Sequence, residues 1–352
     1  MYYVGVDLHK RASWFYVMDE FGKRYMSKSI INDDKILKEC FEAIPKPFNL
    51  AVEATYNWYF FVDLAEQYAE KTYLANSYEL KAFAKRHKKT DKIDARLIAD
   101  ILRKGYLPSV TIPDKKTRGM KEFLRYRMNL VTDRSRNIFR FKALLDKLGK
   151  KATGDFTCRK RIRAILNDKF EPKYAKIIAG YVKCIEDLSD EIKNAEKFIQ
   201  QFAAHDPDII NLISIPGISY FSGALIKTEI IDIDRFASFG RLCAYAGLAP
   251  RVSQSANKNF HGSLNINRRK KLQWILIETV YHFVNALPEK QKKYAALVER
   301  KGANTAKIVM ARDLLKIIYH ILKEKRSFYE RKFDSYNCMK IRSAAAPALC
   351  GV

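Results

Sequence analysis

Residues 2–31 of the chain read YYVGVDLHKRASWFYVMDEFGKRYMSKSII, and this stretch decides the fold of the first hundred residues. Tyr2–Asp7 is a short apolar run, and Ser13–Asp19 is aromatic and β-branched. Arg24–Ile31 follows a turn at Phe21-Gly22-Lys23. Runs of this composition, separated by turn residues, predict three strands that form an antiparallel meander.

Helix and strand patterns alternate over the next fifty residues. We expect a helix over Asp33–Ala43 with Asp33 as its N-cap, a strand over Asn49–Ala54, a helix over Trp58–Ala69 and a strand over Thr72–Ala75. The apolar run over Asn49–Ala54 is typical of a strand that is buried on both faces. Three strands followed by helix, strand, helix and strand is the order of an RNase H/RuvC-like core. The sequence therefore predicts an α/β domain of this class over residues 1–115.

Helical spacing dominates the chain beyond this domain. After a helix over Asp91–Lys104, long amphipathic patterns at Thr117–Leu148 and Lys173–Phe202 flank a short one at Arg159–Leu166. Two long helices joined by a short connection predict a basic, coiled-coil-like arm over residues 116–205. An ordinary helical subdomain fits the same pattern.

A boundary at His205-Asp206-Pro207-Asp208 opens a third region, residues 206–326. Helices are expected over Ile209–Ile215, Tyr220–Ile230, Phe236–Ala246, Arg269–Asn285 and Ala303–Lys325. Gly247–Gly262 is polar and is expected to form a loop. This pattern predicts a mainly α-helical C-terminal domain. The basic, aromatic tail over residues 327–352 is expected to be frayed.

The charge balance points to a polyanionic partner. The 352 residues include 65 Lys and Arg against 39 Asp and Glu, a formal net charge of +26. Such an excess repels itself in a compact protein, and nucleic acid is the first candidate to compensate it. A membrane surface is the second. A compact metabolic enzyme with a small neutral substrate is disfavoured.

Several classes are excluded by motif. No run approaches 18 uninterrupted apolar residues, so no membrane span is expected. The first seven residues lack a basic segment and end in an acid, which disfavours a signal peptide. The six cysteines form no C-x-x-C pair, which disfavours a zinc site or a disulfide framework. Scattered free thiols fit a reducing compartment, so we expect a cytoplasmic protein.

Four acids are placed for metal-dependent phosphodiester chemistry. Asp7 and Glu53 end two predicted strands, and Asp91 and Asp94 share one face at the start of a predicted helix. Cleavage with two Mg²⁺ ions needs hard oxygen ligands around ions about 4 Å apart. The alternative roles are a helix N-cap for Asp91 and a solvated first-turn acid for Asp94. The basic run before this helix favours the metal site, because it would hold phosphate nearby: Lys85, Arg86, Lys88 and Lys89.

Two further regions are candidates for phosphate contact. Ile215-Pro216-Gly217-Ile218 between two helices resembles a helix-hairpin-helix, in which Gly217 lets backbone N–H groups approach phosphate. A plain helical hairpin without a ligand fits equally. Arg235–Ile277 has no acid and eight basic residues, and a hydroxyl in its loop at Ser253–Lys258 is placed to attack a phosphate. The candidate contacts here are Arg251, Lys258, Arg268, Arg269, Lys270 and Lys271.

Five blocks in fixed order carry a resemblance to a known family. They are Gly5-Val6-Asp7-Leu8-His9-Lys10, Val52-Glu53-Ala54-Thr55, Lys89-Thr90-Asp91-Lys92-Ile93-Asp94-Ala95, Ile215-Pro216-Gly217-Ile218, and Ala246-Gly247-Leu248-Ala249-Pro250-Arg251 with Gln254-Ser255. Over residues 1–325 the chain resembles the DEDD-type insertion-sequence transposases, the bridge-RNA-guided recombinases related to the Piv DNA invertases.

The resemblance implies a site and partners that composition alone does not give. It implies that Asp7, Glu53, Asp91 and Asp94 hold Mg²⁺ in a RuvC-like domain and that Ser255 is a serine nucleophile. It further implies that DNA is the substrate, that a noncoding RNA guides its choice, and that the protein works as a homo-oligomer, a dimer or a tetramer.

This chain departs from the family pattern near the serine. Ala256 replaces a usual glycine, Ile266-Asn267-Arg268 replaces a Lys-x-Gly, and Gln273 replaces a common arginine. Ser253 is a second candidate nucleophile. Two other interpretations stay open at this point: a RuvC-like metal nuclease of the junction-resolvase type that only hydrolyses, and a non-catalytic nucleic-acid-binding protein.

Overall fold

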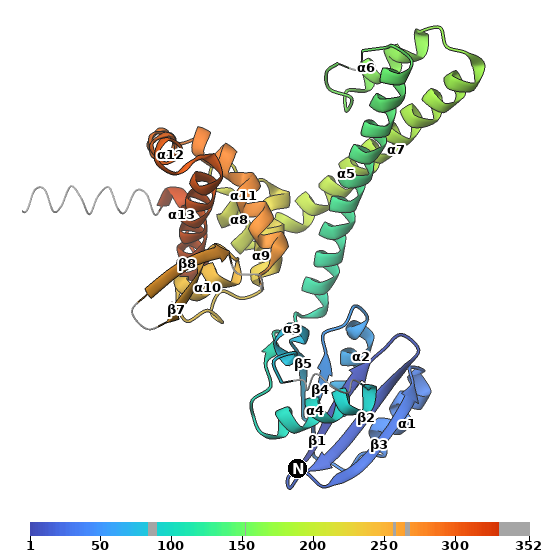
Figure 1. The fold of residues 1–352 in the computed structure, drawn as a ribbon, viewed down its shortest axis with the longest axis vertical. Coiled ribbons are helices and arrows are strands. Elements are labelled where there is room, and N and C mark those ends of the chain that lie inside the picture. Colours follow the sequence, from blue (N-terminus) through green and yellow to red (C-terminus); the bar gives the residue numbers. More distant parts are fainter. Residues whose placement is uncertain (84–89, 152, 256–257, 265–267, 331–352) are drawn as a thin grey trace, which may run out of the picture. The chain divides into compact units, whose positions relative to one another are not determined.

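A computed structural model describes residues 1–83, 90–151, 153–255, 258–264 and 268–330 (Figure 1). The chain divides into two compact units, Met1–Pro113 and Asp114–Val352, each with its own hydrophobic core. The finer division at residues 205/206 and 326/327 stays a prediction. Among the described residues, no helix is both long and apolar enough to cross a membrane.

The first unit is a six-stranded mixed sheet with helices on both faces. Its strands are β1 (Tyr2–Leu8), β2 (Ala12–Asp19), β3 (Arg24–Ile31), β4 (Phe48–Glu53), β5 (Lys71–Ala75) and β6 (Ser109–Val110), in the spatial order β3-β2-β1-β4-β5-β6. Its helices are α1 (Asp34–Glu42), α2 (Trp58–Ala65), α3 (Ser77–Leu80) and α4 (Asp91–Arg103). The predicted meander is confirmed, since β1, β2 and β3 pair antiparallel. The parallel strands β1, β4 and β5 confirm the RNase H-like class.

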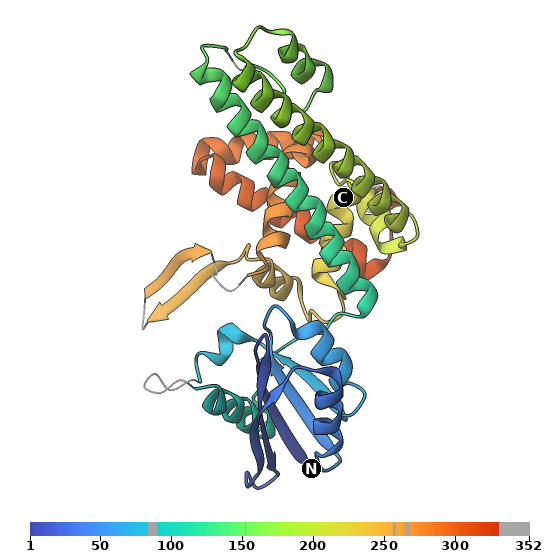
Figure 2. The same cartoon turned by 90° about the vertical axis from the view of Figure 1, so that its right-hand side faces the viewer.

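The two faces of this sheet bury different side chains. On one face Phe15 packs against Phe41 of α1 and Phe61 of α2, with ring centroids 5.8 Å apart in each pair. On the other face α4 lies on β1 and β2, where Ala95 and Ala99 are fully buried. Figure 2 shows the sheet between the teal helix α4 and the two blue helices. The sequence pattern predicted neither β6 nor α3, which are two and four residues long.

The second unit begins with two long helices, as predicted. Helix α5 (Lys115–Lys147) and helix α7 (Pro172–Ala203) pack along each other, and α6 (Arg159–Ala164) and a 3₁₀ turn (Ile165–Asn167) lie in their connection. The rings of Phe123 and Phe198 are tilted against each other with centroids 4.4 Å apart, and Phe141 contacts Tyr181 farther along. These pairs run in opposite directions along the sequence, so the helices are antiparallel.

The rest of the second unit is a helical domain with one hairpin. Its helices are α8 (Pro207–Ile213), α9 (Tyr220–Ile230), α10 (Phe239–Tyr245), α11 (Lys270–Asn285), α12 (Pro288–Lys301) and α13 (Ala303–Glu324). Prediction of a loop over Gly247–Gly262 was wrong, because β7 (Pro250–Ser255) and β8 (Lys258–Leu264) pair antiparallel. The stretch is polar and poor in β-branched residues, so its composition favours a loop, and only cross-strand hydrogen bonding makes it a ribbon. Helix α12 was not predicted.

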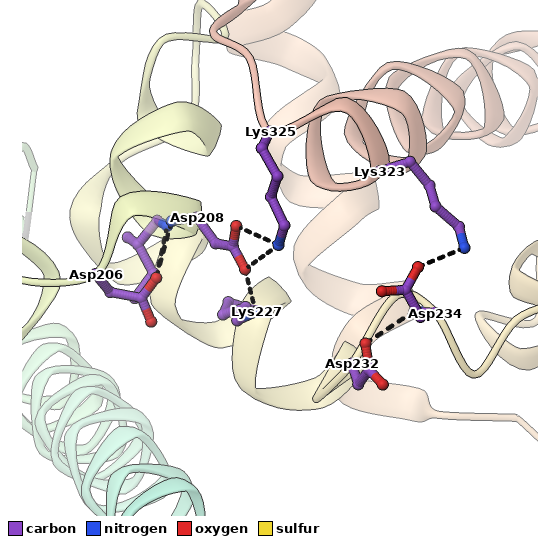
Figure 3. A network of polar contacts seen from close by, with 8 residues as sticks. Asp206, Asp208, Lys227, Asp232, Asp234, Lys323 and Lys325 are labelled. Atoms are coloured by element: carbon purple, nitrogen blue, oxygen red, sulfur yellow. Dashed lines mark hydrogen bonds and ion pairs between the residues drawn. The ribbon is translucent and has the colours of Figure 1, made fainter.

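A buried carboxylate joins three helices of this domain. Asp208 on α8 accepts a hydrogen bond from Lys227 of α9 and is also bound by Lys325, just after α13, whose Nζ lies 2.7 Å from Oδ1 and 3.0 Å from Oδ2 (Figure 3). Burial alone would raise the pKa of Asp208, but the two lysines outweigh burial and lower it. On the surface, Asp234 pairs with Lys323 at 2.6 Å.

Asp208→Asn should lower the free energy of unfolding by about 2 kcal/mol at pH 7, because it leaves two ammonium groups without their shared anion. The wild-type pair stabilises the protein above the ordinary carboxyl pKa, and this stabilisation is lost as pH falls through the lowered pKa of Asp208. Urea unfolding at pH 7 measures the change. The control Asp234→Asn removes an exposed, solvent-screened pair and should cost clearly less than Asp208→Asn. Equal effects of the two substitutions would contradict the prediction.

Candidate active site

Two of the predicted acids, Asp7 and Glu53, lie at the ends of neighbouring strands. Strands β1 and β4 are parallel, and their last paired residues are Val6 and Val52. Asp7 and Glu53 are the next residues on each strand. Successive side chains alternate between the faces of a sheet, so both carboxylates belong to the face opposite Val6 and Val52. This is the face that carries α4.

Gly5 sets the distance between that face and the helix. A Cβ atom at Gly5 would lie 2.1 Å from the Ala95 carbonyl oxygen and 2.4 Å from the Ala99 nitrogen, both backbone atoms of α4. Only a residue without a side chain permits this approach. The helix therefore crosses β1 in direct backbone contact, two residues before Asp7.

The other two acids lie in the first turn of α4. Thr90 is the N-cap of this helix, and its hydroxyl accepts from the Ile93 N–H at 3.3 Å. The alternative role of Asp91 as the N-cap is therefore wrong. Asp91 is exposed and Asp94 half-buried, which leaves the Asp91 carboxylate accessible to a ligand.

A histidine that the sequence analysis did not assign completes the cluster. His9 Nε2 lies 3.3 Å from Asp7 Oδ2 and 3.4 Å from Asp91 Oδ1. One ligand atom from each of the three residues falls within 4.8 Å of the others. The His9 carbonyl accepts from Asn32 Nδ2 at 2.8 Å and from Asn57 Nδ2 at 2.9 Å, which fixes the backbone at this position. The available signal was its position two residues after Asp7.

The electrostatics of Asp7 show that the acids share one region. Burial is the main cause that raises its pKa from 3.8 to about 6. His9 lowers the pKa, and the charges of Glu53, Asp91 and Asp94 each raise it. A buried carboxylate within reach of three others is costly without a cation. The oxygen-rich donor set fits a hard divalent metal ion.

The predicted helix-hairpin-helix glycine has a packing role. Gly217 lies between α8 and α9 with φ +91°, and a Cβ there would be 2.6 Å from the Phe283 nitrogen of α11. Close approach of this turn to α11 accounts for the glycine. Contact with phosphate by its backbone stays a prediction.

The predicted serine region falls on the hairpin. Ser253 and Ser255 lie on β7, and Ser255 pairs with Lys258 of β8 at the end next to the turn. The side chains of residues 250–267, with Arg251 and Lys258 among them, lie outside the described part of the structure, as do Lys85, Arg86, Lys88 and Lys89.

Two of the four cations after the hairpin make internal contacts. Arg268 Nε donates to Gln273 Oε1 at 2.7 Å, and Arg269 Nε donates to the Tyr245 hydroxyl at 2.8 Å. Burial is the main cause that lowers the pKa of Lys271. Lys270 is exposed at the first position of α11. Nucleic-acid contact by these residues stays a prediction.

Two transposase families match this chain, one over the acids and one over the hairpin. Residues 4–149, which contain all four acids, match a transposase family of the DEDD IS110 type. Residues 210–295, which contain the hairpin, match the transposase IS116/IS110/IS902 family. The chain belongs to the IS110 family of transposases. An IS110-family transposase is a DNA transposase and recombinase, and the DEDD type indicates dependence on a divalent metal.

Similar proteins include transposases of insertion sequences and a pilin gene-inverting protein. The transposase for insertion sequence element IS1328 of Yersinia enterocolitica is 22% identical over 90% of this chain and 95% of its own length. The transposase for insertion sequence element IS1111A of Coxiella burnetii is 24% identical over 73% of this chain and 72% of its own length. The pilin gene-inverting protein of Moraxella bovis is 30% identical over 43% of this chain and 51% of its own length.

Proposed function

We propose that this IS110-family transposase cuts and rejoins DNA with two Mg²⁺ ions, held by Asp7, Glu53, Asp91 and Asp94, and with Ser255 as nucleophile. The observation that carries the metal half is the convergence of Asp7, His9 and Asp91 at the edge where β1 ends, with the charges of Glu53 and Asp94 acting on Asp7. The serine half is supported by the position of Ser255 beside the hairpin turn, in an acid-free and cation-rich segment.

The residues of the proposed site have different roles. The metal ions would supply charge neutralisation at the scissile phosphate and at the leaving oxygen. Asp7 is buried and fixed by β1, so it suits a ligand that anchors a cation. Asp91 is exposed and suits a contact on the side open to DNA. His9 holds a position between these two carboxylates.

Covalent attachment would conserve the energy of the broken bond. The Ser255 oxygen forms a bond to phosphorus, the phosphorus–deoxyribose oxygen bond breaks, and the serine proton passes to the released deoxyribose oxygen, which leaves as a hydroxyl. Attack by a different strand's hydroxyl on the phosphoserine reverses these changes, so strands rejoin without an external energy source. A metal nuclease that uses water as its nucleophile does not conserve the energy of the broken phosphodiester bond.

The proposal includes a noncoding guide RNA and a homo-oligomer. The net charge of +26 supports contact with a polyanion, and the family resemblance supports a guide RNA beside the DNA. Ser255 of the same chain or of a second copy must reach the activated phosphate. A mixture of Asp7→Asn and Ser255→Ala proteins distinguishes these routes, because the mixture regains activity only if two copies share one site.

A nicked suicide DNA substrate tests the serine step. With guide RNA and Mg²⁺, the wild-type protein should form a protein–DNA adduct that survives denaturation, and Ser255→Ala should form none. Ser253→Ala is the matched control and should form the adduct. An adduct that persists in Ser255→Ala and disappears in Ser253→Ala would move the nucleophile to Ser253. Strand cleavage without any adduct would support hydrolysis and overturn the serine proposal.

A further inference from the structure

We infer that Gln273 is a positioning residue that fixes the direction of the β7–β8 hairpin, and with it the place of Ser255. This inference rests on the proposed role of Ser255. Gln273 lies on α11, outside the hairpin.

Gln273 holds both ends of the hairpin at once. Its side chain is buried, its Oε1 accepts from Arg268 Nε at 2.7 Å, and its Nε2 donates to the Gly247 carbonyl at 2.7 Å. Gly247 precedes β7 by three residues, and Arg268 follows β8 by four. One amide group on a rigid helix therefore joins the segment that enters the hairpin to the segment that leaves it.

The two ends also touch each other. Gly247 has φ +71°, and a Cβ there would lie 2.4 Å from Arg268 Cδ. The Arg269 N–H donates to the Tyr245 carbonyl at 3.0 Å, and Arg269 Nε donates to the Tyr245 hydroxyl. The base of the hairpin is thus a fixed junction between the end of α10 and the start of α11.

The length of the hairpin explains why its base must be fixed. Five residue steps separate Pro250 from Ser255, and at about 3.3 Å per step the tip lies about 17 Å from the base. A rotation of about 10° at the base then moves the tip by about 3 Å, whereas a misplacement of about 1 Å is enough to cost a reaction about 100-fold. A two-stranded ribbon alone is too weakly stable to hold its own direction.

Glutamine suits this position because its planar amide offers a donor and an acceptor together. Methionine has a similar length and offers neither. Glutamate keeps the acceptor for Arg268 and loses the donor for the Gly247 carbonyl. Gln273→Met and Gln273→Glu therefore remove two contacts and one contact, respectively.

The experiment measures DNA affinity and adduct formation separately, with the full-length protein, guide RNA, Mg²⁺ and the nicked suicide substrate. Gln273→Met should bind DNA within about twofold of wild type, whereas its single-turnover rate of adduct formation should fall about 100-fold, in line with a tip misplaced by about 1 Å. Gln273→Glu should give an intermediate rate. The matched control is Gln291→Met at an exposed position on α12, which should leave both quantities unchanged.

Hydrogen exchange separates positioning from a general loss of structure. In Gln273→Met the amides of the β7–β8 ladder should exchange faster, whereas those of α9 and α13 should keep wild-type protection. Adduct formation at the wild-type rate in Gln273→Met, with none in Ser255→Ala, would overturn this inference and leave the proposed function standing. Equal loss of protection in α9, α13 and the hairpin would also overturn it. Adducts that form equally well in Ser255→Ala would overturn both.

Discussion

Asp7→Asn should abolish metal-dependent strand cleavage and at the same time stabilise the metal-free protein. Loss of a ligand that anchors the catalytic cations removes several kcal/mol of transition-state stabilisation, which corresponds to about 1,000-fold or more in rate. The second effect follows from the pKa of Asp7, which burial raises from 3.8 to about 6. An asparagine at this position carries no charge to bury.

The sign of the pH dependence follows from the same pKa. A carboxyl group whose pKa is raised on folding favours the folded state when protonated, and this stability is lost as pH rises through about 6. Metal-free wild type should therefore lose stability between about pH 4 and 7, by up to about 3 kcal/mol, whereas Asp7→Asn should lack this loss. Thermal unfolding in EDTA across this range measures the difference.

Asp100→Asn is the matched control on α4. Burial acts to raise the pKa of Asp100, but hydrogen bonds from Lys104 and Arg103 outweigh it and lower the pKa. Its replacement should therefore slightly destabilise the protein at neutral pH, opposite in sign to Asp7→Asn, and leave cleavage intact. Retained cleavage in Asp7→Asn would refute the metal-site assignment.

Gly5→Ala should lower cleavage by at least about 100-fold, although Gly5 contacts neither metal nor DNA in the proposal. The added methyl group would meet the Ala95 oxygen and the Ala99 nitrogen more closely than atoms can approach, and neither backbone atom can rotate away. Helix α4 must then move off β1, and it carries Asp91 and Asp94 with it. Overpacking of this kind costs about 1–3 kcal/mol of stability.

Gly180→Ala tests whether the loss is steric and local. Gly180 lies within α7, and a Cβ there meets no atom within 4 Å. The substitution should stabilise that helix by about 1 kcal/mol and leave cleavage unchanged. Single-turnover cleavage and urea unfolding of both variants provide the comparison. Wild-type cleavage by Gly5→Ala would mean that α4 does not position the two acids.

The sequence predicted the parts of the fold that local patterns determine. Strand composition gave the meander, and N-cap chemistry placed the start of α1 at Asp33. The β7–β8 hairpin was missed because its residues carry no alternating apolar pattern, and the ladder hydrogen bonds that form it are not local signals. Helix α12 has only one buried residue, Leu297, so its apolar periodicity is weak.

The sequence named the acids of the proposed site and not the residues that position them. Asp7 and Asp91 could be named because they end a predicted strand and begin a predicted helix, and because a basic run lies just before that helix. His9 could not, because its role depends on a distance to Asp91 across 82 positions of sequence. The same holds for Gly5, whose importance comes from a helix that begins 86 residues later.

The division into two units with separate cores has a consequence for biosynthesis. All four acids are contained in Met1–Pro113, whereas the hairpin begins at Pro250. At about 5–20 residues per second, a ribosome needs about 7–30 s to make the intervening chain. A nascent transposase would thus have its carboxylate cluster folded well before its serine exists. A chain interrupted in that interval would carry the acids proposed to hold metal without the serine proposed to join strands.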